Sequence, residues 1–177
     1  MPDGALVLRT VRLTLHELQL SDLDYIAALL GDPQVMEFWG RVYTREQSLE
    51  WIQRQQARYA RDGYAYWLVR ERSSGRAVGQ AGALRQRVGD RDEAGLAYIL
   101  DKEHWGKGFA TEAAAASLDY IRDVVKRPRA VCLVRPENVR SVSVAEKLAM
   151  SETARIQYYG FEHIVFAKAF TQPEHAL

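Results

Sequence analysis

The feature that most constrains the fold is a strand–helix–strand pattern between residues 96 and 134. Residues 96–100, LAYIL, are a continuous apolar run, and residues 129–134, RAVCLV, form a second one after Pro128. Between the two runs, apolar and small residues recur at the spacing of one buried helix face: Ala110, Ala113, Ala114, Ser117, Leu118, Ile121, Val124 and Val125. Strands joined by such a crossover helix are usually parallel. The pattern predicts one parallel unit inside a mixed sheet.

The other apolar segments predict strands that pair through short turns. Alternation of β-branched and aliphatic residues indicates a strand at 6–15, a hairpin of 64–71 with 77–86, a turn at 89–95, and a last hairpin within 154–170 that turns near Gly160. Neighbouring hairpin strands are antiparallel. We therefore expect an α+β (mixed α/β) domain over residues 1–177, with a mostly antiparallel central sheet and flanking helices.

Cap residues predict the remaining helices. Ser21 stands at an N-cap position, with Asp24 three residues later. Thr44 and Gln47 form a second capping box, and the helix that follows carries Leu49, Ile52, Gln56 and Tyr59 on one face before Asp62-Gly63 ends it. Residues around 33–40 allow one turn of helix at most, and residues 138–149 predict another short helix.

Composition excludes several classes of protein. The 24 basic residues nearly balance the 23 acidic ones, so no basic excess indicates nucleic-acid binding. The lone cysteine, Cys132, cannot form an internal disulfide and is expected to be a core thiol in a reducing compartment. No apolar run is long enough to span a membrane, and Asp3, Arg9 and Arg12 interrupt any signal-like segment. A cytoplasmic location is therefore expected.

The segment HWGKGFATEAAAA, residues 104–116, joins the first strand of the parallel unit to its helix. A helix start offers unpaired N–H groups to an anion, and glycines at 106 and 108 let the backbone approach a phosphate closely. The spacing fits neither an ATP-binding Walker loop nor a dinucleotide-binding fingerprint. An accidental glycine-rich turn is the alternative interpretation of the segment taken alone.

Three motifs in order resemble the GNAT acetyltransferase superfamily. Trp105-Gly106-Lys107-Gly108-Phe109-Ala110 is similar to its pyrophosphate loop, [QR]-x-x-G-x-[GA], in the form found in the branch of bacterial ribosomal-protein N-terminal (alanine) acetyltransferases. PENVRSVSVAEKLAM, 136–150, resembles that branch's P-x-N-x-x-S-x-x-x-x-E-K-L-G-F, and LRTVRLTLHELQLSDLDYIAALLGDPQVMEF resembles its T-x-R-L opening. The resemblance covers residues 6–170 and implies a GNAT-like fold.

The resemblance implies acetyl-CoA as co-substrate. Its pyrophosphate would lie on backbone N–H groups of the loop, and its pantetheine arm beside the preceding strand, where a main-chain N–H would polarise the thioester carbonyl. Asn138 matches the Asn that binds the pantetheine arm, and Lys147 is a candidate for the adenosine phosphates, with a solvated helix lysine as the alternative. The implied cofactor-binding residues are Tyr98, Ile99, Leu100, Trp105, Gly106, Lys107, Gly108, Phe109, Ala110, Thr111, Asn138 and Lys147.

The catalytic positions depart from the family pattern. Many relatives carry Glu where this chain has Gly95, and other superfamily members protonate the thiol with a Tyr where this chain has Ala145. Glu93, two residues before Gly95, is a candidate base acting through water, although an exposed hairpin carboxylate is the simpler interpretation. Ser141 matches the Ser of the branch and is a candidate acid or thiol contact, with a helix-cap role competing.

The acceptor is expected to be a primary amine. The branch favours a protein or peptide N-terminus; a small-molecule amine is the close alternative, and a non-catalytic acyl-CoA-binding sensor is the alternative from another class. Trp39 and Tyr159 are the predicted acceptor contacts. Trp39 belongs to an aromatic-rich region around the early helices whose other members are mostly expected to be core. The histidines lack metal-ligand spacing, so no metal is expected. No membrane or direct nucleic-acid partner is expected, and the sequence leaves open whether the chain is a monomer or a homodimer.

Overall fold

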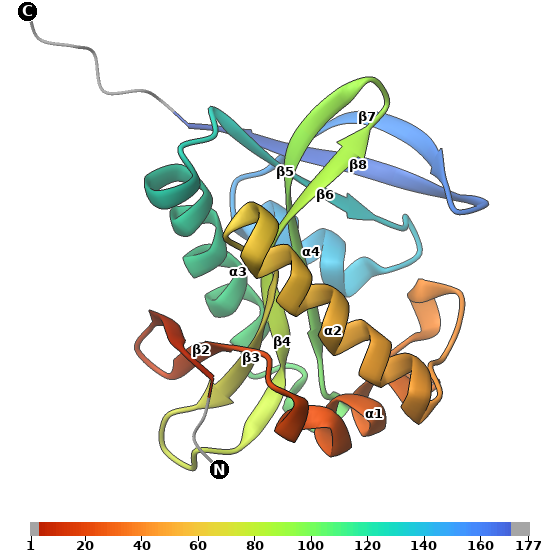
Figure 1. Cartoon of the computed structure of the whole chain (residues 1–177). Coiled ribbons are helices and arrows are strands. Elements are labelled where there is room, and N and C mark those ends of the chain that lie inside the picture. The colour runs from red at the N-terminus through yellow and green to blue at the C-terminus, as the bar shows by residue number, and fades with distance from the viewer. Residues whose placement is uncertain (1–3, 171–177) are drawn as a thin grey trace, which may run out of the picture.

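The computed structural model describes residues 4–170, and its centre is one eight-stranded sheet (Figure 1). The strand order is β1-β2-β3-β4-β5-β6-β8-β7. Only β5 and β6 are parallel, and every other neighbouring pair is antiparallel. The strands are β1 (Leu6–Arg9), β2 (Leu13–Glu17), β3 (Tyr66–Glu71), β4 (Ala77–Val88), β5 (Arg91–Leu100), β6 (Arg129–Val134), β7 (Ser151–Tyr158) and β8 (Phe161–Ala169).

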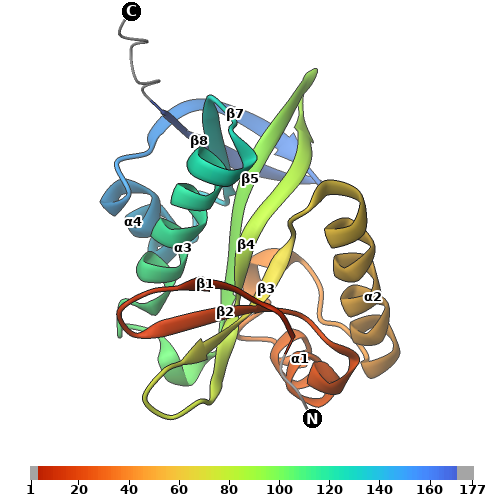
Figure 2. The same ribbon diagram turned by 60° about the vertical axis from the view of Figure 1, so that its left-hand side comes forward.

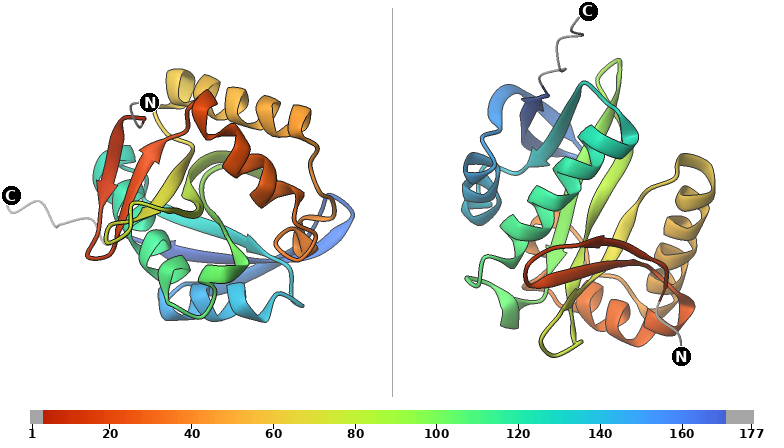
Figure 3. Two further views of the ribbon diagram at one scale, coloured as in Figure 1. Left: turned by 90° about the horizontal axis from the view of Figure 1, so that it is seen from below. Right: turned by 90° about the vertical axis from the view of Figure 1, so that its left-hand side faces the viewer.

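Helices cover both faces of the sheet. Figures 2 and 3 show α1 (Leu23–Gly31) and α2 (Arg45–Asp62) on one side, with α3 (Phe109–Tyr120) and α4 (Val139–Lys147) on the other. Short 3₁₀ turns lie at Leu20–Asp22, Glu37–Trp39 and Lys102–His104, and a π turn at Ile121–Val125 follows α3. The predicted mixed, mostly antiparallel sheet with one parallel strand–helix–strand unit is confirmed.

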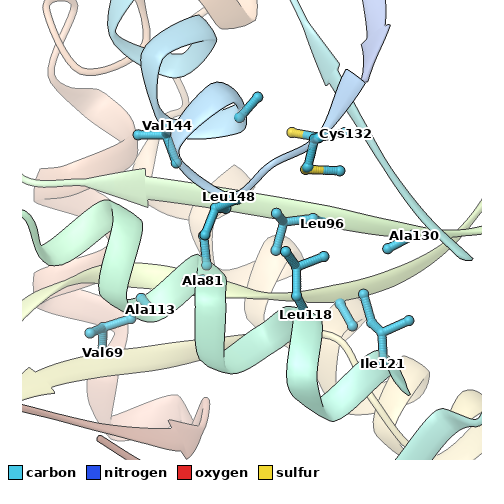
Figure 4. Close-up of a cluster of buried hydrophobic side chains, with 14 of the residues drawn as sticks. Val69, Ala81, Leu96, Ala113, Leu118, Ile121, Ala130, Cys132, Val144 and Leu148 are labelled. Atoms are coloured by element: carbon cyan, nitrogen blue, oxygen red, sulfur yellow. The ribbon is translucent and has the colours of Figure 1, made fainter. Parts of the chain in front are cut away.

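Each face of the sheet has its own apolar cluster. The larger cluster joins α3 and α4 to the sheet and contains Leu96, Leu118, Ile121 and Cys132 (Figure 4). The smaller cluster lies under α1 and α2 and includes Trp51, Tyr66 and Ile99. Successive residues of β5 alternate between the two clusters, as the pleat requires. Cys132 is buried, as expected, and burial raises the pKa of its thiol to about 12.

Three predicted segments differ in the structure. The single strand expected at 6–15 is two strands, because Thr10–Arg12 turn back and pair β1 with β2. The turn expected at 89–95 is shorter, since β5 already begins at Arg91. Ser21 is not the cap of α1: Asp22 holds that position, and the preceding 3₁₀ turn has its own capping box between Gln19 and Asp22.

The helix caps and faces mostly follow the sequence. Thr44 and Gln47 form the predicted capping box of α2, and Gly63 ends that helix in the left-handed conformation. The fully buried face of α2 is shifted, however, to Ser48, Trp51, Ile52 and Gln55. On α3 the predicted alanine face is buried, whereas Val124 is 59% exposed because the π turn rotates it outward.

Candidate functional site

The site begins where β5 and β6 separate. These strands pair only through Ala94 with Ala130 and Gly95 with Val131. Beyond this point β5 continues to Leu100 beside β4, while β6 runs to Val134 beside β8. The carboxyl half of β5 therefore borders an opening in the sheet, which we call the β5–β6 split. Its closed end is at Gly95 and Val131, and its open end leads to the glycine segment.

The glycine segment has the backbone shape that an anion cradle needs. Gly106 and Gly108 have φ of +76° and +79°, a left-handed conformation that favours glycine. Gly108 is the N-cap of α3, so the first N–H groups of this helix lie within the segment. A Cβ at Gly106 would meet nothing within 4 Å, which leaves that side of the segment open to a ligand. These features fit a pyrophosphate.

The turn between β1 and β2 braces this segment. The Glu112 carboxylate, in the first turn of α3, accepts hydrogen bonds from the Thr10 hydroxyl at 2.6 Å, the Arg12 backbone N–H at 2.8 Å and the Arg12 guanidinium at 2.6 Å. The same guanidinium donates to the Lys107 carbonyl at 2.8 Å and lies 4.8 Å from the centre of the Phe109 ring. The T-x-R-L and A-T-E-A motifs therefore meet in space, and together they fix the cradle.

Asn138 and its neighbours line the other side of the split. The Asn138 side-chain oxygen accepts from the Ser141 N–H at 3.2 Å, so Asn138 is the N-cap of α4. Ser141 is half-buried in the first turn, and its carbonyl accepts from the Tyr98 hydroxyl at 3.4 Å. Tyr98 thus reaches from β5 to α4, and burial raises the pKa of its hydroxyl, which stays protonated. The helix-cap role proposed for Ser141 belongs instead to Asn138.

Trp105 joins the cradle to the end of β5. Its indole N–H donates to the Leu100 carbonyl at 2.9 Å, and the Arg140 guanidinium lies 4.1 Å from the centre of its ring. Arg140 projects from the first turn of α4, so it places a positive charge beside the cradle. The sequence reasoning missed Arg140. The signal for it was present, since Arg140 lies two residues after the Asn138 of the same motif.

Lys147 lies farther from the glycine segment than Arg140 does. It is exposed in the last turn of α4, seven residues after Arg140, or about 10 Å along the helix axis. Ile99 and Leu100 lie on the carboxyl half of β5, and Phe109, Ala110 and Thr111 form the first turn of α3. The structure therefore groups the predicted residues of β5 and α3, but not Lys147, around the open end of the split.

Glu93 is not the exposed hairpin carboxylate that was expected. It is 6% exposed on β5, and both of its oxygens accept from the guanidinium of Arg129 at the start of β6. The reason is the early start of β5, which pairs Glu93 with Gln86 inside the sheet rather than leaving it in a turn. Glu93 therefore has a structural ion pair, which competes with any role in moving protons.

The predicted acceptor contacts lie on two segments that meet. Trp39 is 42% exposed and precedes Gly40, where an added Cβ would lie 3.1 Å from the ring of Phe161 on β8. Tyr159, 86% exposed, occupies the tight turn before Phe161 and packs edge-to-face on Tyr158 with ring centres 4.5 Å apart. The Arg135 guanidinium lies 4.0 Å from the centre of the Phe161 ring. Most other aromatic residues of the early helices are core, as predicted.

Two further observations concern the described residues. No three of their His, Cys, Asp or Glu side chains are grouped as a metal ion requires. None of the helices within residues 4–170 combines the length and the apolar character needed to cross a membrane.

Known proteins share both the sequence pattern and the fold. Residues 12–151 match the family described as acetyltransferase (GNAT) domain. The chain is 30% identical over 129 residues to the uncharacterized protein YkkB of Bacillus subtilis, covering 73% of this chain and 75% of that protein. It is 25% identical over 154 residues to the uncharacterized N-acetyltransferase p20 of Bacillus licheniformis, covering 86% of each.

Solved structures extend this likeness. An acetyltransferase from Agrobacterium tumefaciens aligns with a TM-score of 0.81 at 24% identity, covering 96% of this chain and 95% of that one. A RimL ribosomal L7/L12 α-N-protein acetyltransferase in complex with coenzyme A aligns with a TM-score of 0.77 at 17% identity, covering 93% and 98%. Its bound coenzyme A agrees with the acetyl-CoA expected from the sequence. The family match, the fold and the braced glycine cradle together establish that this chain belongs to the GNAT acetyltransferase family.

Proposed function

We propose that this protein is an acetyl-CoA-dependent N-acetyltransferase that acts on a primary amine at the N-terminus of a polypeptide. The observation that carries the proposal is the braced glycine cradle at the open end of the β5–β6 split, opposite the capped start of α4. The pyrophosphate would lie on the open side of Gly106, near Trp105 and the Arg140 guanidinium that stacks on it. The split is bordered by main-chain groups of β5 along which an extended arm can lie.

Direct transfer within a ternary complex is the chemistry proposed for this arrangement. The neutral amine nitrogen forms a bond to the acetyl carbonyl carbon, the carbon–sulfur bond breaks, and the amine loses a proton while the thiolate gains one. A main-chain N–H near Ile99 or Leu100 would stabilise the charge that develops on the carbonyl oxygen. Ser141 is the proposed proton donor or thiol contact, since its first-turn position on α4 lies beside Tyr98.

The exposed aromatic surface supports a polypeptide acceptor. Trp39, Tyr159 and Phe161 are each more than 40% exposed, and the Gly40–Phe161 contact brings their segments together. Aromatic side chains at a surface supply large contact area at low entropic cost. The named ribosomal-protein acetyltransferases among the similar structures point the same way, although an aminoglycoside acetyltransferase, AAC(6')-Ib, shares the fold as well.

The test is thiol release from acetyl-CoA across an amine panel, after acetyl-CoA binding has been measured by calorimetry. The panel contains Ala- and Ser-starting peptides, polyamines, aminoglycosides and free amino acids. We expect turnover with the peptides, and weaker turnover when Trp39 or Tyr159 is replaced by Ala. Turnover confined to a small-molecule class would contradict the polypeptide acceptor, and failure to bind acetyl-CoA would contradict the whole proposal.

The second candidate is a non-catalytic acyl-CoA-binding sensor. The observation in its favour is that Glu93, the carboxylate nearest to Gly95 along β5, is held by Arg129. Tight acetyl-CoA binding without turnover on any amine would support this candidate.

A further inference from the structure

Arg135 follows the last residue of β6 and stands across the split from the reacting end of β5. The parallel pair Gly95–Val131 closes the split. Four residues farther along each strand, the same register brings Arg135 to the level of Ile99. Ile99 lies where the thioester carbonyl is proposed to meet a main-chain N–H. An amine that attacks this carbonyl is therefore at the level of Arg135.

The Arg135 side chain lies on the face of the sheet that carries α1 and α2. Ile99 packs into the apolar cluster under these helices, whereas Val134 packs into the cluster under α3 and α4. Side chains alternate along a strand, so Arg135 points away from the face of Val134. Its ring contacts agree, since its guanidinium lies 4.0 Å from the centre of the Phe161 ring and 5.9 Å from that of Phe38. The glycine cradle belongs to α3 on the other face, which leaves the Arg135 face to the acceptor.

The two rings hold the guanidinium and leave its hydrogen-bond donors unused. The Arg135 side chain is 17% exposed, and its Nε is fully buried. This Nε lies 3.4 Å from Oε2 of Glu137, but Arg135 donates no hydrogen bond within residues 4–170. The Glu137 side chain is 63% exposed, so water screens the ion pair. Because a buried donor without an acceptor is costly, the guanidinium is suited to a second, better-placed anion.

Three polar groups near Arg135 on this face are neutral or positive. Extending the antiparallel register of β6 and β8 places His163 next to Arg135. The His163 Nδ1 donates to a backbone carbonyl at 3.0 Å, so the ring is neutral or positive. Tyr158 on β7 packs edge-on against this ring, and burial raises the pKa of its hydroxyl, which stays protonated. Arg58 of α2 lies near Tyr158 and adds a second cation. An acceptor at the split therefore meets positive charge on this face.

We infer that Arg135 binds a carboxylate of the acceptor, and that the enzyme prefers polypeptides with Asp or Glu among their first three residues. The inference rests on the proposed function and adds a specificity-determining residue to it. A guanidinium offers parallel N–H donors that match the two oxygens of a carboxylate. An extended chain advances about 3.3–3.6 Å per residue and neighbouring strands lie about 4.8 Å apart, so a side chain one or two residues from the amine can cross from Ile99 to Arg135. Polyamines and aminoglycosides carry several positive charges and would be repelled.

The first experiment measures kcat/KM with peptides that share a serine N-terminus and differ at one position. Asp, Asn or Lys stands at the second position in one series and at the third in another, with no other charged side chain. We expect the Asp peptide of at least one series to exceed its Asn counterpart about tenfold, the size of a hydrogen bond to a charged group, and the Lys peptide to be the poorest. Equal values across both series would overturn the inference.

Three variants assign the preference to Arg135. Arg135→Gln keeps a long polar side chain without the charge and should reduce the ratio of Asp to Asn peptide to about one, with KM for acetyl-CoA unchanged. Arg135→Lys keeps the charge but loses the fork of donors and should retain part of the ratio. Arg155→Gln is the matched control and should leave the ratio unchanged, because Arg155 is a half-exposed cation on the opposite face of the sheet. A ratio that survives Arg135→Gln would refute the assignment.

Glu137→Gln tests the same contact from the other side. It removes the exposed carboxylate beside Arg135 and keeps its size. Because the substrate carboxylate then meets no competitor, KM for the Asp peptide should fall about twofold while KM for the Asn peptide stays unchanged. A rise in KM for the Asp peptide would contradict a carboxylate bound at Arg135.

Binding without chemistry separates this inference from the function beneath it. Calorimetry measures the affinity of the Asp and Asn peptides for protein saturated with coenzyme A, and thermal unfolding shows that each variant is folded. Tighter binding of the Asp peptide, lost in Arg135→Gln, with no turnover on any amine would support the Arg135 contact and defeat the proposed enzyme. Turnover with equal affinity and equal kcat/KM for the two peptides would keep the enzyme and overturn the inference. Turnover on free amino acids alone, lost in Arg135→Gln, would place an α-carboxylate on Arg135 and defeat the polypeptide acceptor.

Discussion

At the scale of single residues, Glu112 shows how one carboxylate ties together parts of the chain that lie far apart. Partial burial raises the pKa of Glu112, but hydrogen bonds from the Thr10 hydroxyl, the Arg12 backbone and the Arg12 guanidinium outweigh it and hold that pKa below its usual range. The carboxylate is therefore bound more strongly in the folded chain than in the unfolded one, where it meets only water.

This lowered pKa predicts a pH dependence of stability. A carboxyl group whose pKa is depressed by folding stabilises the fold above its unfolded pKa, about 4.3, and loses that contribution as pH falls through the folded pKa. The difference in unfolding free energy between wild type and Glu112→Gln should therefore be constant from pH 5 to 8 and shrink below about pH 4. Urea unfolding at several pH values measures it, and a difference that grows in acid would contradict the assignment.

Arg140 gives the second prediction at this scale. Its guanidinium stacks on Trp105 beside the glycine cradle, where a pyrophosphate would add a charge-assisted contact. Arg140→Ala is expected to weaken coenzyme A binding about tenfold, because a hydrogen bond to a charged group contributes about 1.5 kcal/mol. Calorimetry on Arg140→Ala and Lys147→Ala compares the two cations. A larger loss with Lys147→Ala would reverse the order inferred from the structure.

At the scale of elements, the cap of α2 can be tested in isolation from the site. Thr44 accepts from the Gln47 N–H, and the Gln47 side chain accepts from the Thr44 N–H. Thr44→Ala should lower the unfolding free energy by about 1 kcal/mol, the usual cost of losing an N-cap. Thr44→Ser keeps the hydroxyl and should lose much less. The denaturant midpoints of the two variants, compared at an unchanged m-value, measure both losses of unfolding free energy. Equal losses for Thr44→Ala and Thr44→Ser would exclude the cap as the cause.

Local signals predicted most elements, because their causes are local. The caps of α2, the β6 run after Pro128 and the last hairpin around Gly160 each depend on residues within a few positions. The site was less accessible to prediction. The bond between Thr10 and Glu112 joins residues 102 positions apart, and no pattern in either segment shows the other as its partner.

The clearest wrong prediction is that Glu93 is an exposed hairpin carboxylate, and the pairing of β4 with β5 explains it. Five extra residues at the start of β5, 91–95, place Glu93 in the sheet rather than in the predicted turn, and there Arg129 reaches it. Register depends on the turn between β4 and β5, where Gly89 has a φ of +58°. The sequence GDRDEAG contains several residues that favour turns, so the number of them that actually turn was ambiguous.

At the scale of the whole molecule, the site joins the two helices on one face of the sheet, α3 and α4, to the turn between β1 and β2. The cradle belongs to α3, its brace to the β1–β2 turn, and the opposite wall of the split to α4. A ligand that bridges these parts stabilises the folded chain by about 2.7 kcal/mol at a concentration 100 times its Kd. For a chain of this size, coenzyme A should then raise the Tm by roughly 5–10 °C.

Thermal unfolding with increasing coenzyme A measures this shift. Adenosine, which lacks the pyrophosphate, should produce little or none at the same concentration, because the glycine cradle would be empty. An equal shift from both ligands would show that the cradle contributes nothing to binding.

The brace between Arg12 and Glu112 also has a consequence for synthesis. These residues are 100 positions apart, and chains grow at about 5–20 residues per second. The turn that contains Thr10 and Arg12 therefore leaves the ribosome roughly 5–20 s before its carboxylate partner does. Until Glu112 emerges, the turn between β1 and β2 lacks its carboxylate partner, and the glycine segment just before Glu112 is not braced. Each newly made copy thus acquires its cradle late, once the growing chain is well past its midpoint.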